Sequence, residues 1–236
     1  MSKIRDLSDQ LIGAIFRSWF IDFDPVKSKS EGVLPFGMDE QTSALFPDSF
    51  ENSKHGPIPS GWKLGTLSDI ATFQNGYAFS SSDWCEEGVP VIKIGSVKPG
   101  FADLNSCSYV QEDVVRGLGK FRLSRGDILV GMTGYVGETG LVPNSNVAPY
   151  LNQRVGNIIP RERMNYEFLY AAVRIPSFKY HVETFATGSA QANVSSTNIM
   201  QYTIVIPPSK LMEHFSEIIA PKIELILESF SMFEFS

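Results

Sequence analysis

The chain has 236 residues, of which 43% are hydrophobic and 19% charged, and its net charge is −6, a composition typical of globular rather than disordered proteins. No run of about 18 apolar residues is present, so we expect no transmembrane helix, and the first ten residues lack the pattern of a secretory signal. Cys85 and Cys107 lie far apart in the sequence, with no histidine at metal-ligand spacing. We therefore expect reduced thiols, a cytoplasmic protein and no metal site.

Residues 3–20 predict an amphipathic helix. Ile4, Leu7 and Leu11 recur at steps of three and four residues, and the stripe is widened by Ile12, Ile15, Phe16 and Trp19. A helix this short is marginal in water, so it must pack on another element. We expect it to end at Asp24-Pro25. Residues 25–60 are rich in Pro, Gly and Ser and predict a linker, so residues 1–24 form a unit of their own.

Residues 61–207 alternate short β-type runs with turn signals and predict a single mixed domain. The expected strands are Ala71–Phe73, Pro90–Ile94, Asp127–Met132, Gly140–Val142, Val155–Ile159 and Thr203–Ile206. One expected helix runs from Tyr166 to about Val173 with Asn165 as its cap, and a second covers Ser177–Phe185. The fold class is therefore α+β, and the glycines between 131 and 140 favour a strongly bent sheet.

Residues 208–236 predict a second long helix. Its apolar residues lie at heptad-like steps that suit packing against another helix: Met212, Phe215, Ile219, Ile223 and Ile226. Pro221 should kink this helix, because it removes one backbone hydrogen bond. Such a stripe is also compatible with an ordinary core.

Motifs of catalysis are missing from the sequence. There is no phosphate-binding GxxxxGK[ST] loop, no GxGxxG turn, no HExxH and no GxSxG. The glycine-rich stretch GMTGYVGETG at 131–140 lacks the lysine and the spacing of a phosphate loop. Ala148-Pro149-Tyr150 is only a partial echo of the tetrapeptide with which adenine methyltransferases hold a flipped base. We therefore expect no enzyme activity in this chain.

Charge is unevenly distributed. Residues 1–60 hold six Lys and Arg against nine Asp and Glu, residues 61–207 hold twelve of each, and residues 208–236 hold two against five. Within the middle segment the candidate phosphate contacts are Lys93, Lys98, Arg116, Lys120, Arg122 and Arg125. Solvated surface is the alternative interpretation of these cations.

Polar and aromatic side chains gather on the glycine-rich turns of the same segment. Asn and Gln can pair with adenine, Arg with guanine, and a Thr methyl group can touch thymine. The candidate base contacts are Tyr77, Thr133, Tyr135, Asn152, Gln153, Arg154, Ser189, Gln191 and Asn193. Turn chemistry alone also favours Asn and Ser at such places.

Five blocks in order resemble specificity subunits of type I restriction–modification systems. They are LIGAIFRSWFIDFDPV at 11–26, ALFPDSFENSKHGPIPSGWKLGTLSDI at 44–70, SRGDILVGMTGYVGETGLV at 124–142, YLNQRV at 150–155, and GSAQANVSSTNI at 188–199 closing on IVIPP at 204–208. The resemblance implies a recognition domain clasped by long helices that pack as an antiparallel coiled coil. It also implies double-stranded DNA as a ligand, and as partners methyltransferase subunits and a restriction subunit, which would hold S-adenosylmethionine, ATP and Mg²⁺.

Members of that family read a bipartite site with two recognition domains, whereas this chain has one. A natural half-length subunit and a piece of a longer subunit both remain open. A half-length subunit would pair with a second copy through its terminal helices. The expected interface residues are Leu7, Leu11, Ile15, Trp19, Phe215, Ile219, Ile223 and Ile226.

Two other classes of function remain open. The acidic flanks favour a regulatory or interaction module that binds methyltransferase subunits without reading DNA. The third class is an unrecognised nuclease or methyltransferase, which would act on DNA with Mg²⁺ or S-adenosylmethionine.

Overall fold

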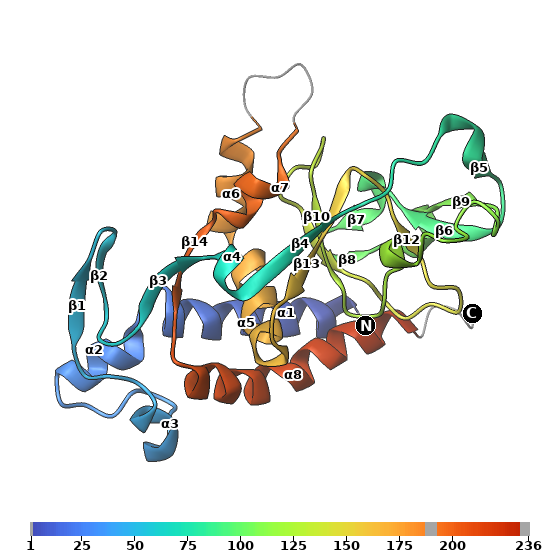
Figure 1. Cartoon of the computed structure of the whole chain (residues 1–236). Helices are drawn as coiled ribbons and strands as arrows, with labels where there is room; N and C mark the ends of the chain where they lie inside the picture. The colour runs from blue at the N-terminus through green and yellow to red at the C-terminus, as the bar shows by residue number, and fades with distance from the viewer. Residues whose placement is uncertain (1, 187–192, 232–236) are drawn as a thin grey trace.

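The computed structural model describes residues 2–186 and 193–231 (Figure 1). Helices α1 (Ser2–Phe20) and α8 (Ser209–Ser231) lie side by side along one side of the molecule and run in opposite directions. Helix α5 (Tyr166–Arg174) packs on both of them. The prediction of a mixed α/β fold with long helices near both ends is confirmed.

Aromatic rings hold these three helices together. The ring centroid of Phe16 lies 5.2 Å from that of Phe168 and 6.1 Å from that of Phe215. The Phe20 centroid lies 5.0 Å from those of both Phe168 and Phe215. None of these four side chains is more than 2% exposed. Each such burial contributes about 1.5–3 kcal/mol, so the cluster explains why a 19-residue helix forms here.

The apolar seam of α8 faces inward. Phe215, Ile219, Ile223 and Ile226 are at most 2% exposed, and Trp19 is 7% exposed. The expectation that these five side chains are exposed for a second copy is wrong, because α1, α5 and α8 of the same chain cover one another. Ile15 is half-buried. Exposure remains only at the other two expected interface residues, Leu7 at 66% and Leu11 at 44%.

Helix α1 (Ser2–Phe20) matches the expected range 3–20, and it ends ahead of Asp24-Pro25, the pair that was expected to stop it. Phe23 has a positive φ of 54°, and the chain then turns directly into helix α2 (Asp24–Ser30). Pro25 stands in the first turn of α2, where its missing N–H leaves no hydrogen bond unmade. The proline therefore begins a helix here. In α8, Pro221 lies inside the helix without ending it.

Residues 25–60, expected to be a linker, contain further regular structure. After α2 come helix α3 (Glu40–Ala44) and an antiparallel hairpin of β1 (Phe50–Ser53) and β2 (Gly56–Pro59). The Phe46 and Trp19 rings meet edge-on at 5.1 Å, and the Lys29 ammonium donates to the carbonyls of Ser43 and Phe46. The ring contact ties the segment to the end of α1, and the Lys29 hydrogen bonds hold α2 to the residues in and after α3.

Two sheets form most of the remaining structure. The six-stranded sheet has the order β4-β13-β10-β11-β8-β7, with strands Ala71–Asn75, Val155–Pro160, Ile128–Gly131, Thr139–Leu141, Gly100–Ala102 and Val97–Lys98. The four-stranded sheet has the order β12-β6-β9-β5, with strands Tyr150–Leu151, Val89–Ile92, Ser108–Val110 and Trp84–Cys85. The expected strands thus divide among three sheets where the sequence predicted one bent sheet, and the chain crosses between the four-stranded and the six-stranded sheet at residues 152–154.

Shorter elements close the domain. Strands β3 (Lys63–Thr66) and β14 (Thr203–Ile206) pair antiparallel at its two ends. Helix α4 (Leu67–Ile70) follows β3, while α6 (Pro176–Thr184) and α7 (Ser196–Met200) lie on the side of α5 away from α1 and α8 (Figure 1). Asn165 precedes α5 as expected, but its amide donates to the Ile70 carbonyl at 3.2 Å and makes no cap.

Candidate nucleic-acid interface

The turn at 152–154 lies where the two sheets meet. Asn152 is 6% exposed, and its side-chain oxygen accepts the backbone N–H of Arg154 at 3.3 Å. Its carbonyl accepts the N–H of Val155 at 2.9 Å, where β13 begins. The next two side chains, Gln153 and Arg154, are exposed. Asn152 thus builds the turn, and Gln153 and Arg154 are the residues that it presents.

A second segment, residues 74–77 at the end of β4, is joined to this turn. Tyr77 donates its N–H to the Leu151 carbonyl at 2.8 Å and accepts from the N–H of Gln153 at 2.9 Å. A Cβ at Gly76 would lie 2.1 Å from the carbonyl oxygen of Asn152. Only glycine therefore permits this approach. The side-chain amide of Gln74 donates to the Lys120 carbonyl, which brings in a third segment.

Segment 120–122 places cations beside aromatic rings. Arg122 forms an isolated antiparallel β-bridge with Tyr150 through the backbone. The ring centroid of Phe121 lies 5.3 Å from that of Tyr77. The Lys120 ammonium lies 4.7 Å from the centroid of the Phe121 ring. Lys120 and Arg122 are both exposed. An ammonium over an aromatic face is held by the ring's quadrupole while its other side stays open to a phosphate.

Lys93, the residue directly after β6, repeats this arrangement. Its ammonium lies 4.4 Å from the Trp84 ring centroid. The preceding residue, Ile92, accepts the N–H of Asn152 at 3.2 Å, so Lys93 follows directly beside the 152–154 turn. Trp84 and Phe121 were not among the expected site residues. The Lys120-Phe121 pair in the sequence is the signal that could have found this feature.

The turn between β10 and β11 adds the last segments. Met132 donates its N–H to the Arg154 carbonyl at 3.0 Å, and the Thr133 hydroxyl donates to Asn193 at 3.0 Å. Thr133 is only 6% exposed, whereas Tyr135 at the tip is 68% exposed. Thr133 therefore supports the turn, and Tyr135 is its accessible ring.

We call the combined surface the recognition strip. It comprises residues 74–77, 93, 120–122, 132–135, 150–154 and 193. Its cations are Lys93, Lys120, Arg122 and Arg154, and these segments hold no Asp or Glu. A surface with this charge and with exposed Tyr135, Gln153 and Arg154 can bind phosphates, stack on bases and pair with base edges. The strip is therefore a basic surface in a chain of net charge −6.

The other expected contacts lie elsewhere or at the margin. Arg125 makes an ion pair with Glu224 of α8, with a shortest N–O distance of 2.7 Å. Lys98 stands opposite Phe101, whose ring lies under Arg5 of α1. Arg116 shares with Arg122 the wall of a hollow of about 540 Å³ next to the strip. Ser189 and Gln191 lie outside the described residues.

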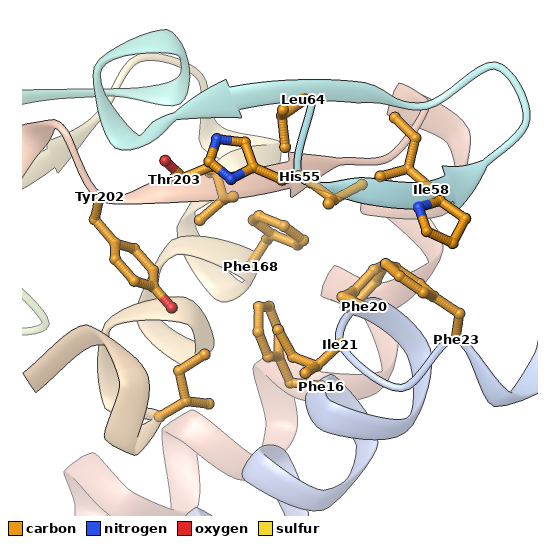
Figure 2. Close-up of a pocket in the computed structure, with 14 residues that line it drawn as sticks. Phe16, Phe20, Ile21, Phe23, His55, Ile58, Leu64, Phe168, Tyr202 and Thr203 are labelled. Atoms are coloured by element: carbon orange, nitrogen blue, oxygen red, sulfur yellow. The ribbon is translucent and has the colours of Figure 1, made fainter. Parts of the chain in front are cut away.

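A separate hollow lies between α1, the β1–β2 hairpin and the β3–β14 pair (Figure 2). Its volume is about 260 Å³, and its walls are mostly apolar, including Phe16, Phe20, Ile58 and Phe168. It contains no residue of the recognition strip. Among the residues that the structure describes, no cluster of His, Cys, Asp and Glu could hold a metal ion, and no helix is long and apolar enough to span a membrane.

The sequence is similar to those of known proteins. The HindI specificity subunit of Haemophilus influenzae is 24% identical over 92% of this chain and 55% of its own length. The MjaVIII specificity subunit of Methanocaldococcus jannaschii is 26% identical over 88% of this chain and 48% of its own. The chain therefore spans about half the length of the curated relatives that it matches.

The fold is also similar to a solved structure. An HsdS subunit from Thermoanaerobacter tengcongensis superposes with a TM-score of 0.51 and 12% identity, covering 95% of this chain and half of that one. The family described as "Type I restriction modification DNA specificity domain" matches residues 59–225. That match covers most of the chain, so this chain belongs to the family of type I restriction–modification DNA specificity domains.

Proposed function

We propose that this chain reads a DNA sequence and directs partner subunits to it. The single observation behind the proposal is the recognition strip, which joins four cations and the exposed Tyr135, Gln153 and Arg154 in connected segments that contain no Asp or Glu. The cations would hold phosphates and fix the register of the duplex, while Gln153 and Arg154 would contact base edges. Its membership of the specificity-domain family supports the same function.

In this proposal the chain makes and breaks no bonds. Methyltransferase subunits with S-adenosylmethionine, and a restriction subunit with ATP and Mg²⁺, would act at the site that the chain selects. Helices α1 and α8 would serve as the assembly side, as parts of an antiparallel coiled coil. The exposed Leu7 and Leu11 support pairing of α1 with a second helix, because they lie one turn apart on the same face. Two copies would supply both halves of a bipartite site.

Co-expression with the cognate methyltransferase subunit tests the proposal. We expect methylation at one defined motif across the host genome, absent when the chain is omitted. A double substitution of Gln153→Ala and Arg154→Ala should abolish or broaden the motif while the chain still co-purifies with the methyltransferase. Methylation without any shared motif, or an unchanged motif in the double variant, would contradict the proposal.

A regulatory module is the second candidate, because acidic residues gather on α8. Glu213, Glu217 and Glu228 are exposed there, and such a surface could occupy the DNA groove of a methyltransferase subunit. The same co-expression separates the two functions. A regulator would lower methylation by a methyltransferase that already has its own specificity subunit, and it would impose no new motif.

A further inference from the structure

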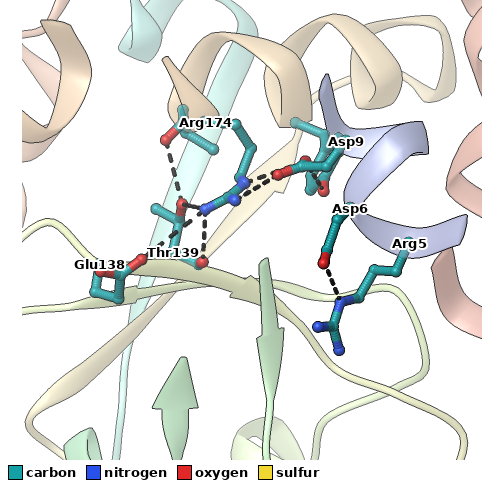
Figure 3. Close-up of polar contacts among 8 residues, drawn as sticks. Arg5, Asp6, Asp9, Glu138, Thr139 and Arg174 are labelled. Atoms are coloured by element: carbon teal, nitrogen blue, oxygen red, sulfur yellow. Dashed lines mark hydrogen bonds and ion pairs between the residues drawn. The ribbon is translucent and has the colours of Figure 1, made fainter. Parts of the chain in front are cut away.

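A row of charged side chains connects helix α1 with the turn that bears Tyr135 (Figure 3). It starts at Asp9 of α1, passes through Arg174 at the end of α5, and reaches Glu138 and Lys179. Asp9 lies between Leu7 and Leu11 in the sequence, on the helix that we assign to assembly. The row thus joins the assembly side of the molecule to the recognition strip.

Arg174 is the centre of the row. Its guanidinium donates to the Asp9 carboxylate at 2.6 Å, and the Tyr170 hydroxyl donates to the same carboxylate at 2.8 Å. The Arg174 side chain is 17% exposed. Burial and the neighbouring Asp9 charge raise the pKa of Tyr170 well above its usual value, so this hydroxyl remains a donor. Asp9 is therefore fixed by two donors from α5.

The same guanidinium also contacts the end of the β10–β11 turn that bears Tyr135, which we call the recognition turn. It donates to the backbone carbonyl of Thr139 at 3.2 Å and to the Thr139 hydroxyl at 3.3 Å. Its nearest approach to the Glu138 carboxylate is 3.9 Å, and Lys179 donates to that carboxylate from α6 at 2.9 Å. The last residue of the turn and the first of β11 are thus held by two cations from two helices.

The turn itself has little freedom to adjust. Gly131 donates to the Glu138 carbonyl at 2.8 Å and accepts from Gly137 at 2.9 Å, which closes the loop around Tyr135. Gly137 has a φ of 75°, and a Cβ there would meet the backbone of Lys179 at 3.2 Å. A change in the position of Glu138 and Thr139 would therefore be passed on to Tyr135.

Partly buried ion pairs add little net stability, because removing their charges from water offsets the attraction between them. What they impose is geometry, since a guanidinium that donates to one carboxylate, a carbonyl and a hydroxyl while facing a second carboxylate permits few arrangements. Simple tethering of α5 would need only Asp9 and Arg174. The additional contacts to Glu138 and Thr139 connect the row to the recognition turn.

We propose that Asp9, Arg174 and Glu138 are positioning residues for sequence discrimination: they hold the Tyr135 turn at a fixed place relative to α1. The inference rests on the proposed function. It implies that the row determines the preference for the target sequence over other DNA. General attraction to phosphates, which resides in Lys93, Lys120, Arg122 and Arg154, does not depend on it.

The test compares Asp9→Asn with Asp22→Asn in the complex with the methyltransferase subunit. The control is matched, because Asp22 also makes an ion pair, with Arg17 at 2.9 Å, near the other end of α1. The probes are a duplex containing the motif found by methylation mapping and a scrambled duplex of equal length. For Asp9→Asn we expect roughly a tenfold fall in the ratio of the two affinities, the size of losing one base-pair contact. The scrambled-duplex affinity should not change.

Glu138→Gln should behave like Asp9→Asn, and Asp22→Asn should keep the wild-type ratio. Equal losses for both duplexes, or an unchanged ratio in both Asp9→Asn and Glu138→Gln, would overturn the inference. Should Asp9→Asn fail to fold, Lys179→Ala replaces it, because the Lys179 side chain is 46% exposed and its loss should leave the fold intact. We expect the same fall in the ratio of the two affinities for this variant. No sequence preference in the wild-type complex would instead refute the proposed function, and the inference with it.

Discussion

Lys120 and Arg122 are the exposed cations of segment 120–122 in the recognition strip. Each phosphate contact releases condensed counterions, so the dependence of log K on log salt becomes shallower by about one unit when one such contact is lost. We expect this change for both Lys120→Ala and Arg122→Ala, with similar weakening on every DNA sequence. Filter binding at several salt concentrations measures it. The control is Lys27→Ala on α2, and an unchanged slope in both strip variants would remove these residues from the contact surface.

Cys107 gives a prediction of pH dependence. Burial raises the pKa of its thiol to about 11. The reactive thiolate is therefore scarce at pH 8, and its fraction grows tenfold per pH unit until the pKa is reached. We expect iodoacetamide to label Cys107 roughly 100-fold more slowly in the folded chain than in urea at pH 8. Mass spectrometry of the modified peptide checks this, and equal rates in both states would contradict it.

Residue types alone did not distinguish presenting side chains from supporting ones. Thr133 and Asn152 have the chemistry of base contacts, yet both side chains are buried and make hydrogen bonds that support their own turns. Arg125 has the charge of a phosphate contact, yet it pairs with Glu224, 99 residues away. Such assignments depend on distant partners, which local spacing does not show.

Among the elements, those with a clear period were predicted. The six expected strands and four expected helices are present with shifts of a few residues at their ends. Strands β5, β7 and β12 have two residues each and show no alternation, so the sequence contains no signal for them. Helix α2 was missed for a different reason, because Pro25 is equally compatible with a helix end and a helix start.

The close approach of segment 74–77 to turn 152–154 gives a prediction at the scale of elements. Gly76→Ala would place a Cβ against the Asn152 carbonyl and push segment 74–77 away from turn 152–154. We expect the variant to lose affinity for the target duplex by about tenfold or more, in the range of a lost base contact. Gly95→Ala is the control, because a Cβ there meets nothing within 4 Å. Equal binding by the two variants would show that the junction does not set the position of Gln153.

The aromatic cluster of α1, α5 and α8 gives a second prediction at the scale of elements. Phe215 is fully buried among Phe16, Trp19, Phe20 and Phe168. Phe215→Ala should lower the free energy of unfolding by about 3–5 kcal/mol, because the cavity adds to the lost transfer free energy. Urea denaturation followed by circular dichroism measures the change. A loss below 1 kcal/mol would mean that the helices do not depend on this ring.

At the scale of the whole molecule, the exposed stripe of α1 predicts association. Ile4, Leu7 and Leu11 are 53%, 66% and 44% exposed and recur at helical spacing. We expect a concentration-dependent dimer in sedimentation experiments, and a monomer for the double variant Leu7→Asp and Leu11→Asp. The melting temperature of that variant should stay close to wild type, because neither side chain belongs to the core. A wild-type mass that stays monomeric at all concentrations would contradict the prediction.

Strands β3 and β14 pair in register from Thr66–Thr203 to Lys63–Ile206. Everything between them leaves and rejoins the helical base at neighbouring points, so topologically it is an insert. A different insert could be grafted between residues 66 and 203 without lengthening any connection. The graft would have one requirement: it must bring its own counterpart of α5, because Phe168 and Leu169 complete the core of the base. If the chain reads DNA as proposed, new DNA sequence specificities should therefore be obtainable by exchanging whole inserts at these two positions.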